Sequence, residues 1–249
     1  MGAKIKNDSI GQERLRHNLK VKYLLDKILA YPVFFLAMPF FLLTAWIIKL
    51  DGWLNPKNAG SIFYLEPRIS AGKPFKVFKF RTVTKKDVDW IRKEPQERSI
   101  TWHTTRTDAG KIIIKWYFDE VPQLINILKG DMSFVGPRPH IKGVYDKEVE
   151  EGLFYRTIMR AGLFGIPQSC KRNPKHKALF ERLARQNKAE KSVLNTLDGV
   201  YARECIYSST WRVVALDFII LAYFFLVFLK GSPVQTDGAK PLSASDNKA

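Results

Sequence analysis

The sequence predicts an α/β domain, mostly helical with a short β-ribbon, that is embedded in a membrane. Three observations support this prediction. The run 28–48 holds no charged residue, and the segments 62–67 and 75–83 alternate as strands do. After residue 119 an apolar stripe with helical spacing begins. The chain of 249 residues is long enough for one good-sized domain with appendages.

Charge and cysteine usage narrow the class of partner and the compartment. Lys and Arg number 41 against 24 Asp and Glu, a formal net charge of +17. This excess indicates an anionic partner: nucleic acid, an acidic membrane surface or a phosphorylated substrate. The long apolar segments and the lack of a recognised nucleic-acid motif argue against nucleic acid. Cys170 and Cys205 have no metal-ligand or C-x-x-C spacing, so we expect free thiols in a reducing compartment.

The apolar run 28–48 reads as a membrane segment. Its 21 residues could cross a hydrocarbon core, since a helix rises about 1.5 Å per residue and the core is about 30 Å thick. Pro32 and Pro39 interrupt it, and we expect the sharper kink at the central Pro39. Basic residues flank both ends, whereas a spanning helix prefers them on the cytoplasmic side. The residues alone leave a kinked spanning helix and a helix–break–helix hairpin, re-entrant in one leaflet, equally open.

A second apolar segment, 213–229, has 17 residues and contains Asp217. It is short for a span, and a carboxylate in its middle is costly in lipid. We therefore expect a helix that lies at the interface or packs on the domain, with Arg212 and Lys230 reaching headgroups, although a second span stays open. Helical patterns also cover 119–129, about 144–158 and the basic segment 175–196, which is either a solvated face or a footing on anionic lipid.

Two adjacent carboxylates, Asp119 and Glu120, open the helix predicted over 119–129. Asp119 suits an N-cap, Glu120 suits the positive end of the helix dipole, and Gly130 suits the end of the helix. Capping is therefore the simpler explanation. Adjacent carboxylates can also divide labour, because one can hold a divalent ion while the other attacks or transfers a proton.

A longer pattern surrounds this pair. The matched residues are Asp119-Glu120, Pro122-Gln123-Leu124, Asn126, Gly130-Asp131-Met132-Ser133, Val135 and Gly136-Pro137-Arg138-Pro139. This pattern resembles the signature of the bacterial sugar transferases, also called monotopic phosphoglycosyl transferases. The resemblance covers about residues 20 to 230. It includes Arg68, Lys73–Thr82, Gly110, the apolar run with Pro39, and the element with Gly162, Gly165, Gln168, Arg172 and Asn173.

The resemblance implies an enzyme that moves a sugar 1-phosphate from a nucleoside diphosphate sugar, here a UDP-sugar, to undecaprenyl phosphate. It implies that Asp119 is the nucleophile, that Glu120 helps to hold Mg²⁺, and that Pro39 is the break of a re-entrant hairpin. Such an enzyme lies in the bacterial inner membrane, faces the cytoplasm, contacts anionic lipids and starts polysaccharide or glycoconjugate synthesis. We expect the donor phosphates to be bound by basic and polar side chains: Lys79, Arg81, Arg138, Gln168 and Arg172.

Alternatives remain for two of these cations and for the whole chain. Lys79 could be the solvent face of a strand, and Arg138 could be a structural guanidinium bonded to carbonyls. The chain departs from the usual pattern at four places: Leu65-Glu66-Pro67, Ile114, Ala161–Gly165 and Ser169-Cys170-Lys171. Asp198 is the candidate for a carboxylate that the family has before its last helix. These departures leave open the sugar, the nucleotide, and a second hypothesis, a non-catalytic membrane scaffold of the same fold.

The predicted organisation follows the chain. It begins with a basic extension over 1–19 and a re-entrant membrane hairpin over 20–51. A catalytic domain on the cytoplasmic face covers 52–208. A C-terminal apolar or interfacial helix over 209–231 and a disordered tail over 232–249 complete it. The sequence leaves a homodimer open.

Overall fold

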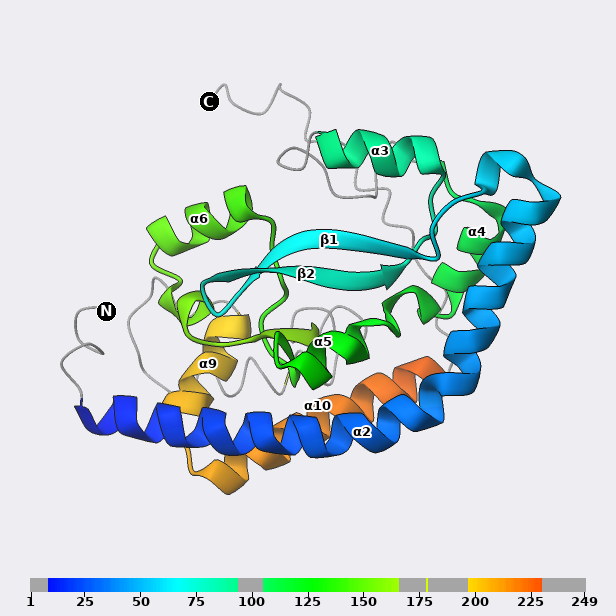
Figure 1. The fold of residues 1–249 in the computed structure, drawn as a ribbon. Helices are drawn as coiled ribbons and strands as arrows, with labels where there is room; N and C mark the ends of the chain where they lie inside the picture. The colour runs from blue at the N-terminus through cyan, green and yellow to red at the C-terminus, as the bar shows by residue number, and fades with distance from the viewer. Residues whose placement is uncertain (1–8, 94–104, 166–177, 179–196, 230–249) are drawn as a thin grey trace.

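A computed structural model describes residues 9–93, 105–165, 178 and 197–229. Two long helices, α2 (Ser9–Leu54) and α10 (Thr210–Leu229), lie along one side of the molecule and form its base (Figure 1). A two-stranded ribbon stands above this base, and α5 (Gln123–Lys129) lies between the two (Figure 1). The prediction of a mostly helical fold with small sheets is confirmed.

The first helix, α2, is a continuous element of 46 residues that contains both Pro32 and Pro39. It follows the base and then turns upward beside α4 (Asp108–Lys115) (Figure 1). The sequence predicts a break at Pro39, but the helix is unbroken there. A proline removes one backbone donor and crowds the preceding turn, so a long helix can absorb it as a bend. The helix also begins at Ser9, inside the segment expected to be a basic extension.

Most of the apolar surface of α2 is uncovered. Within the described residues, one helix is long and apolar enough to cross a membrane, and it covers Glu13–Leu54. Its most apolar stretch is only 11% buried inside the protein. The core helix of a soluble protein would be mostly buried, so this exposure favours membrane association.

Where α2 meets α10, a group of buried polar side chains joins the two helices. We call this group the base cluster: Lys22, Asp26, Ser133, Tyr201 and Asp217. The ammonium of Lys22 lies 2.6 Å from Asp217 Oδ2 and 3.9 Å from Asp26 Oδ2. The hydroxyl of Tyr201 donates to Asp217, and Ser133 Oγ donates to Asp26 Oδ2 at 2.6 Å. The base cluster explains how an apolar helix accommodates Asp217, because the carboxylate is paired inside the protein.

The ribbon consists of β1 (Phe63–Ser70) and β2 (Lys73–Phe80), which pair antiparallel around a two-residue turn. Both predicted strands are confirmed, with ends shifted by a few residues. A second small sheet pairs β3 (Met132–Val135) with β4 (Ala161–Phe164) in parallel. The main core lies between these sheets and the base, and α5, α9 (Leu197–Tyr207), α10 and the start of α2 contribute to it.

The remaining described elements are short. They are η1 (Pro56–Asn58), α3 (Lys85–Lys93), α4, η2 (Phe118–Glu120), α6 (Lys142–Glu150) and η3 (Phe154–Thr157). The helix expected over about 144–158 is thus divided into α6 and η3. Gly152 separates them with a φ of 91°, a left-handed conformation that stops a right-handed helix. The predicted helix 175–196 and the predicted tail 232–249 lie outside the described residues.

Candidate active site

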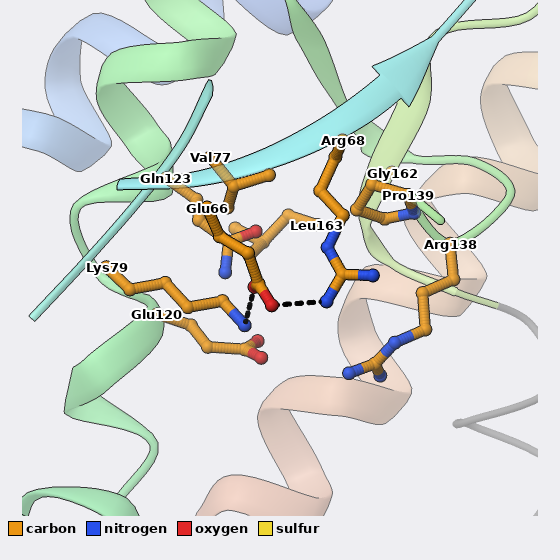
Figure 2. A pocket seen from close by; sticks show the side chains of 10 residues that line it. All are labelled: Glu66, Arg68, Val77, Lys79, Glu120, Gln123, Arg138, Pro139, Gly162 and Leu163. Atoms are coloured by element: carbon orange, nitrogen blue, oxygen red, sulfur yellow. Dashed lines mark hydrogen bonds and ion pairs between the residues drawn. The ribbon is translucent and has the colours of Figure 1, made fainter. Parts of the chain in front are cut away.

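A polar pocket opens beside the ribbon, at the start of α5 (Figure 2). One face of the ribbon forms a wall, because residues two apart on a strand point to the same side. The other walls come from η2, from α5, from the loop after β3 and from β4. The lining residues are Glu66, Arg68, Val77, Lys79, Glu120, Gln123, Arg138, Pro139, Gly162 and Leu163.

The carboxylate pair lies in a tight turn at the edge of this pocket. Asp119 and Glu120 belong to the 3₁₀ turn η2, and α5 begins only at Gln123. The prediction that Asp119 is the N-cap of the helix is therefore wrong: Pro122 holds that position, without a side-chain cap. Tyr117 precedes the turn with a φ of 57°, a strained backbone for a residue with a large side chain. The helix ends at Gly130, as predicted.

Asp119 is half-buried and lies in an unusual electrostatic environment. Burial raises the pKa of its carboxyl to about 7, and the neighbouring charge of Glu120 adds to this rise. Lys79 and Arg106 act in the opposite direction, since their charges favour the ionised form. Asp119 is not among the residues that line the pocket, whereas Glu120 is. Glu120 therefore lines the pocket directly, while Asp119 lies outside the lining but within the electrostatic influence of the pocket cation Lys79.

Three cations surround the space in front of Glu120. Figure 2 shows the side chain of Lys79 descending from the ribbon so that its ammonium lies between the carboxylates of Glu66 and Glu120. Arg138 extends toward the same space from the opposite wall, and it is exposed (Figure 2). Arg68 completes the set from β1. An anion that entered the pocket would lie between cations on opposite walls.

Glu66 is the most enclosed charged group of the pocket, with 4% exposure. Its Oε1 lies 2.5 Å from Arg68 Nη2, and its Oε2 lies 3.1 Å from Lys79 Nζ. Burial alone would raise the pKa of Glu66, but the charges of Lys79 and Arg68 outweigh it, so the pKa lies below its ordinary value. Glu66 is thus a carboxylate ion-paired to two cations.

Asn126 fixes α5, the helix that follows the carboxylate pair Asp119-Glu120, to the ribbon. It is fully buried on α5, its Oδ1 accepts from Phe78 N at 2.9 Å, and its Nδ2 donates to Lys76 O at 2.8 Å. These two bonds satisfy groups on the edge of β2 that would otherwise lack partners. The turn that carries Glu120 is therefore held in register with the strand that carries Lys79.

The backbone of Arg138 is anchored from behind. Arg156 Nη1 donates to the carbonyl of Arg138 at 2.7 Å, and Arg156 Nε lies 2.6 Å from Glu148 Oε2. Its Nη2 lies 3.4 Å from Asp198 Oδ2. Burial raises the pKa of Asp198 to about 7, and Glu148 adds to this rise while Arg156 opposes it. Of the two arginines, Arg156 is the one bonded to a carbonyl, whereas Arg138 presents its side chain to the pocket.

One residue in the lining of the pocket, Gly162, has to be a glycine. A Cβ at Gly162 would lie 2.2 Å from the nitrogen of Gly136, far inside the contact distance of two backbone segments. This close approach brings β4 against the rigid Gly136–Pro139 run. The two segments therefore form one continuous part of the pocket wall.

The remaining predicted site residues lie elsewhere. Arg81 is buried, and its guanidinium donates to three carbonyls, those of Asn58, Ser61 and Val83, at 2.7 to 2.8 Å. It does not line the pocket. Gln168 and Arg172 lie outside the described residues, and so does Cys170, while Cys205 is a buried free thiol.

Four contributors were not predicted as site residues: Glu66, Arg68, Gln123 and Arg156. The matched pattern includes Arg68 and Gln123, and Glu66 belongs to one of the departures from it, but none of these three was given a role. The alternation of β1 could have found Glu66 and Arg68, because both share the face that carries Lys79 once the strands pair. Gln123 lies inside the helix predicted over 119–129 and belongs to the matched pattern around the carboxylate pair. Arg156 has no local signal, since its partners are 8 to 42 positions away in the sequence.

The carboxylates of the site decide what kind of metal site it could form. Among the described residues, no group of three or more His, Cys, Asp or Glu side chains could hold an ion. Mg²⁺ commonly uses one or two carboxylates and completes its coordination with water and substrate phosphates. Glu120, an oxygen donor on the pocket wall, fits that mode better than an all-protein site.

Comparison with known proteins gives a consistent family. A family model described as bacterial sugar transferase matches residues 17–231. The chain is 34% identical over 148 residues to the UDP-N-acetylgalactosamine-undecaprenyl-phosphate N-acetylgalactosaminephosphotransferase of Aeromonas hydrophila, covering 58% of this chain and 32% of that one. It is 34% identical over 164 residues to the exopolysaccharide production protein ExoY of Sinorhizobium fredii, covering 59% and 68%.

A third relative extends the same picture. The UDP-glucose:undecaprenyl-phosphate glucose-1-phosphate transferase of Escherichia coli is 30% identical over 146 residues, which is 57% of this chain and 29% of that protein. The matched part thus spans about a third of the length of the Aeromonas and Escherichia proteins. Since the family match covers most of the described residues and the whole pocket, the chain belongs to the bacterial sugar transferase family.

Proposed function

We propose that this protein transfers a sugar 1-phosphate from a UDP-sugar to undecaprenyl phosphate and thereby initiates polysaccharide or glycoconjugate synthesis. One observation carries the proposal: a single pocket combines a dyad carboxylate, Glu120, with the cations Arg68, Lys79 and Arg138. A diphosphate needs such cations, and a transferred phosphoryl group needs an adjacent nucleophile. Asp119 is that nucleophile, next to Glu120 in a strained turn.

The chemistry has two balanced steps. A carboxylate oxygen of Asp119 attacks the phosphorus that carries the sugar, and the bond from that phosphorus to the bridging oxygen breaks. The nucleoside monophosphate leaves with that oxygen and its electron pair. A phosphate oxygen of undecaprenyl phosphate then attacks the same phosphorus, and the Asp119 carboxylate leaves with its electron pair. A covalent intermediate lets a soluble donor and a lipid acceptor use one site in turn.

Each cation has a role in the first step. Lys79 and Arg68 would bind phosphate oxygens from the ribbon side, and Arg138 would bind them from the opposite wall. Glu120 would hold Mg²⁺ together with donor oxygens, and the ion would neutralise phosphate charge so that one anion can approach another. The strained turn at Tyr117 and the Asn126 bonds hold the nucleophile near its target.

The apolar residues at the base of the molecule support a proposed location in the membrane. The exposed apolar residues of α2 would enter one leaflet from the cytoplasmic side of the inner membrane and return, with the bend of the helix as the point of reversal. Exposed basic residues on α2, such as Lys20 and Lys49, would meet anionic headgroups. Cysteine-accessibility labelling should find residues before Lys22 and after Asp51 on the same side. Labelling on opposite sides would refute the re-entrant arrangement.

The deciding experiment incubates detergent-purified protein with radiolabelled UDP-sugars, Mg²⁺ and undecaprenyl phosphate. We expect label on the protein with donor alone, and lipid-linked label once the acceptor is added. Asp119→Asn should abolish both. Asp108→Asn, which changes an exposed aspartate whose Oδ1 lies 2.8 Å from Lys111 Nζ, should keep both. If wild-type protein never takes up label from a broad panel of donors, the scaffold hypothesis replaces this one.

A further inference from the structure

The feature that the proposed function does not use is Glu66. A phosphate-binding pocket gains from cations, yet here a buried carboxylate sits between two of them, Arg68 and Lys79. Its two oxygens each face a different cation, as two oxygens of a phosphate group would. Glu66 therefore fills, before any ligand arrives, the position where the cation pair would hold an anion.

Glu66 is fixed in this position. It lies in the middle of β1, where its backbone pairs with Val77, and only 4% of the residue is exposed. The cations are less constrained. Lys79 Nζ lies 3.1 Å from Glu66 Oε2, but within the described contacts this oxygen accepts no hydrogen bond of ordinary geometry. Lys79 is thus held mainly by charge, and its long side chain can turn to a second acceptor.

We propose that Glu66 is an internal counterion that limits how tightly the pocket holds phosphate groups. This inference rests on the proposed function only in that phosphates enter this pocket. The lining residues carry three cations and two carboxylates, so Glu66 removes half of the positive excess that the pocket would otherwise have. The negative charge of Glu66 weakens the binding of a donor only slightly when the donor enters with a divalent cation. It weakens the binding of the nucleoside monophosphate product more, because that phosphate carries no cation, and the product therefore leaves more readily.

A binding experiment tests this without any transfer reaction. Inorganic pyrophosphate is titrated into the detergent-solubilised full chain by calorimetry, at low salt and with a chelator. Glu66→Gln should bind pyrophosphate about tenfold more tightly than wild type, because one repulsive charge at contact distance is removed. Glu66→Asp, which keeps the charge, should stay closer to wild type than Glu66→Gln does.

The matched control is Glu204→Gln. Glu204 is also 4% exposed and ion-paired, its Oε2 lying 2.9 Å from Arg212 Nε, but it belongs to α9 and does not line the pocket. The Glu204→Gln variant should bind pyrophosphate with the same affinity as wild type. A misfolded variant would bind less tightly, so a gain in affinity cannot arise from damage.

Two outcomes would overturn the inference. Equal or weaker binding by Glu66→Gln would mean that Glu66 organises the cations instead of competing for them. No pyrophosphate binding by any variant would mean that this pocket is not a phosphate site. Failure of the proposed function is seen separately, as absent label transfer in the enzymatic assay. In that case, tighter pyrophosphate binding by Glu66→Gln would still support the role of Glu66 as an internal counterion.

Discussion

The pocket and the base cluster use the same chemistry for different ends. In each, a lysine ammonium faces carboxylates, and in each one carboxylate is almost fully buried. In the base cluster Lys22 is 2% exposed, its partner Asp217 also accepts from Tyr201, and Asp26 accepts from Ser133. In the pocket Lys79 is partly exposed, and Arg138 faces open space.

The difference teaches how to separate a structural ion pair from a functional one. Charge, residue type and distance do not separate the two regions, since the Lys–carboxylate separations are 2.6 and 3.9 Å in the base cluster and 3.1 Å in the pocket. What differs is whether the cation can exchange its partner. Lys22 is enclosed by groups that complete each other's hydrogen bonds, so an exchange would leave a buried charge alone. Lys79 can exchange partners because its outer side is open.

The largest effect is expected from opening the base cluster. Lys22→Met leaves Asp26 and Asp217 as uncompensated buried carboxylates, and breaking such a pair costs about 3–5 kcal/mol of the free energy of unfolding. Chemical unfolding in detergent measures this cost. Lys20→Met, an exposed neighbour on the same helix, should change the free energy of unfolding by less than about 0.5 kcal/mol. If both variants lose the same amount, the base cluster does not differ from a surface ion pair.

A change at Asp198 should have an intermediate effect on stability. Its carboxyl is buried like those of the base cluster, but it is incompletely paired. Its Oδ1 is buried without a hydrogen-bond partner among the described contacts, and the charged groups that face it are Arg156 and Glu148. Its folded pKa of about 7 exceeds the ordinary value of 3.8. The folded state therefore binds the proton more tightly, and stability falls as pH rises from about 4 to about 7.

The slope from one such group is at most about 1.4 kcal/mol per pH unit. Asp198→Asn should make the stability profile between about pH 4 and pH 7 less steep, as measured by unfolding midpoints across pH, and Asp119, whose pKa is also raised to about 7, should account for slope that remains. Asp108→Asn, at an exposed position, should leave the profile unchanged. An Asp198→Asn profile that keeps the slope of wild type would show that another group causes it.

The smallest effect on stability is expected in the pocket. Lys79→Gln leaves Glu66 paired with Arg68, so it should cost no more than about 1 kcal/mol of unfolding free energy. The same change should weaken pyrophosphate binding about tenfold, because a phosphate ligand is lost. Lys73→Gln, exposed on the same strand, should change neither quantity. A large loss of stability without weaker pyrophosphate binding would mean that Lys79, like Lys22, forms a structural ion pair.

Much of the architecture was predictable because its signals are local. The uncharged run 28–48, the alternation in the ribbon and the glycine that ends α5 all act within a few residues. The predicted cap at Asp119 was wrong because Pro122 begins the helix instead, which leaves the dyad in a separate 3₁₀ turn. The break expected at Pro39 was replaced by a continuous helix, since one lost donor can be absorbed over many turns.

The site was predictable as far as the pattern around residues 118–139 extends. Lys79 and Arg81 were both predicted to bind phosphate because they are basic residues of the stretch Lys73–Thr82 that resembles the family's strand. β2 ends at Phe80, however, so Arg81 no longer follows the alternation and turns to the carbonyls of Asn58, Ser61 and Val83. The partners of Glu66 and Arg156 depend on pairing between segments that no single stretch of sequence specifies.

The base cluster also sets an order of events during synthesis. Lys22 and Asp217 are 195 positions apart, and Asn18 donates to the carbonyl of Cys205, 187 positions away. A ribosome adds roughly 5–20 residues per second, so α2 must wait on the order of 10 to 40 seconds for these partners. During that interval its buried lysine and carboxylate remain hydrated while its apolar half is already complete. Charged groups without partners are costly away from water, so these side chains of α2 have to stay hydrated until α10 has been made and supplies Asp217.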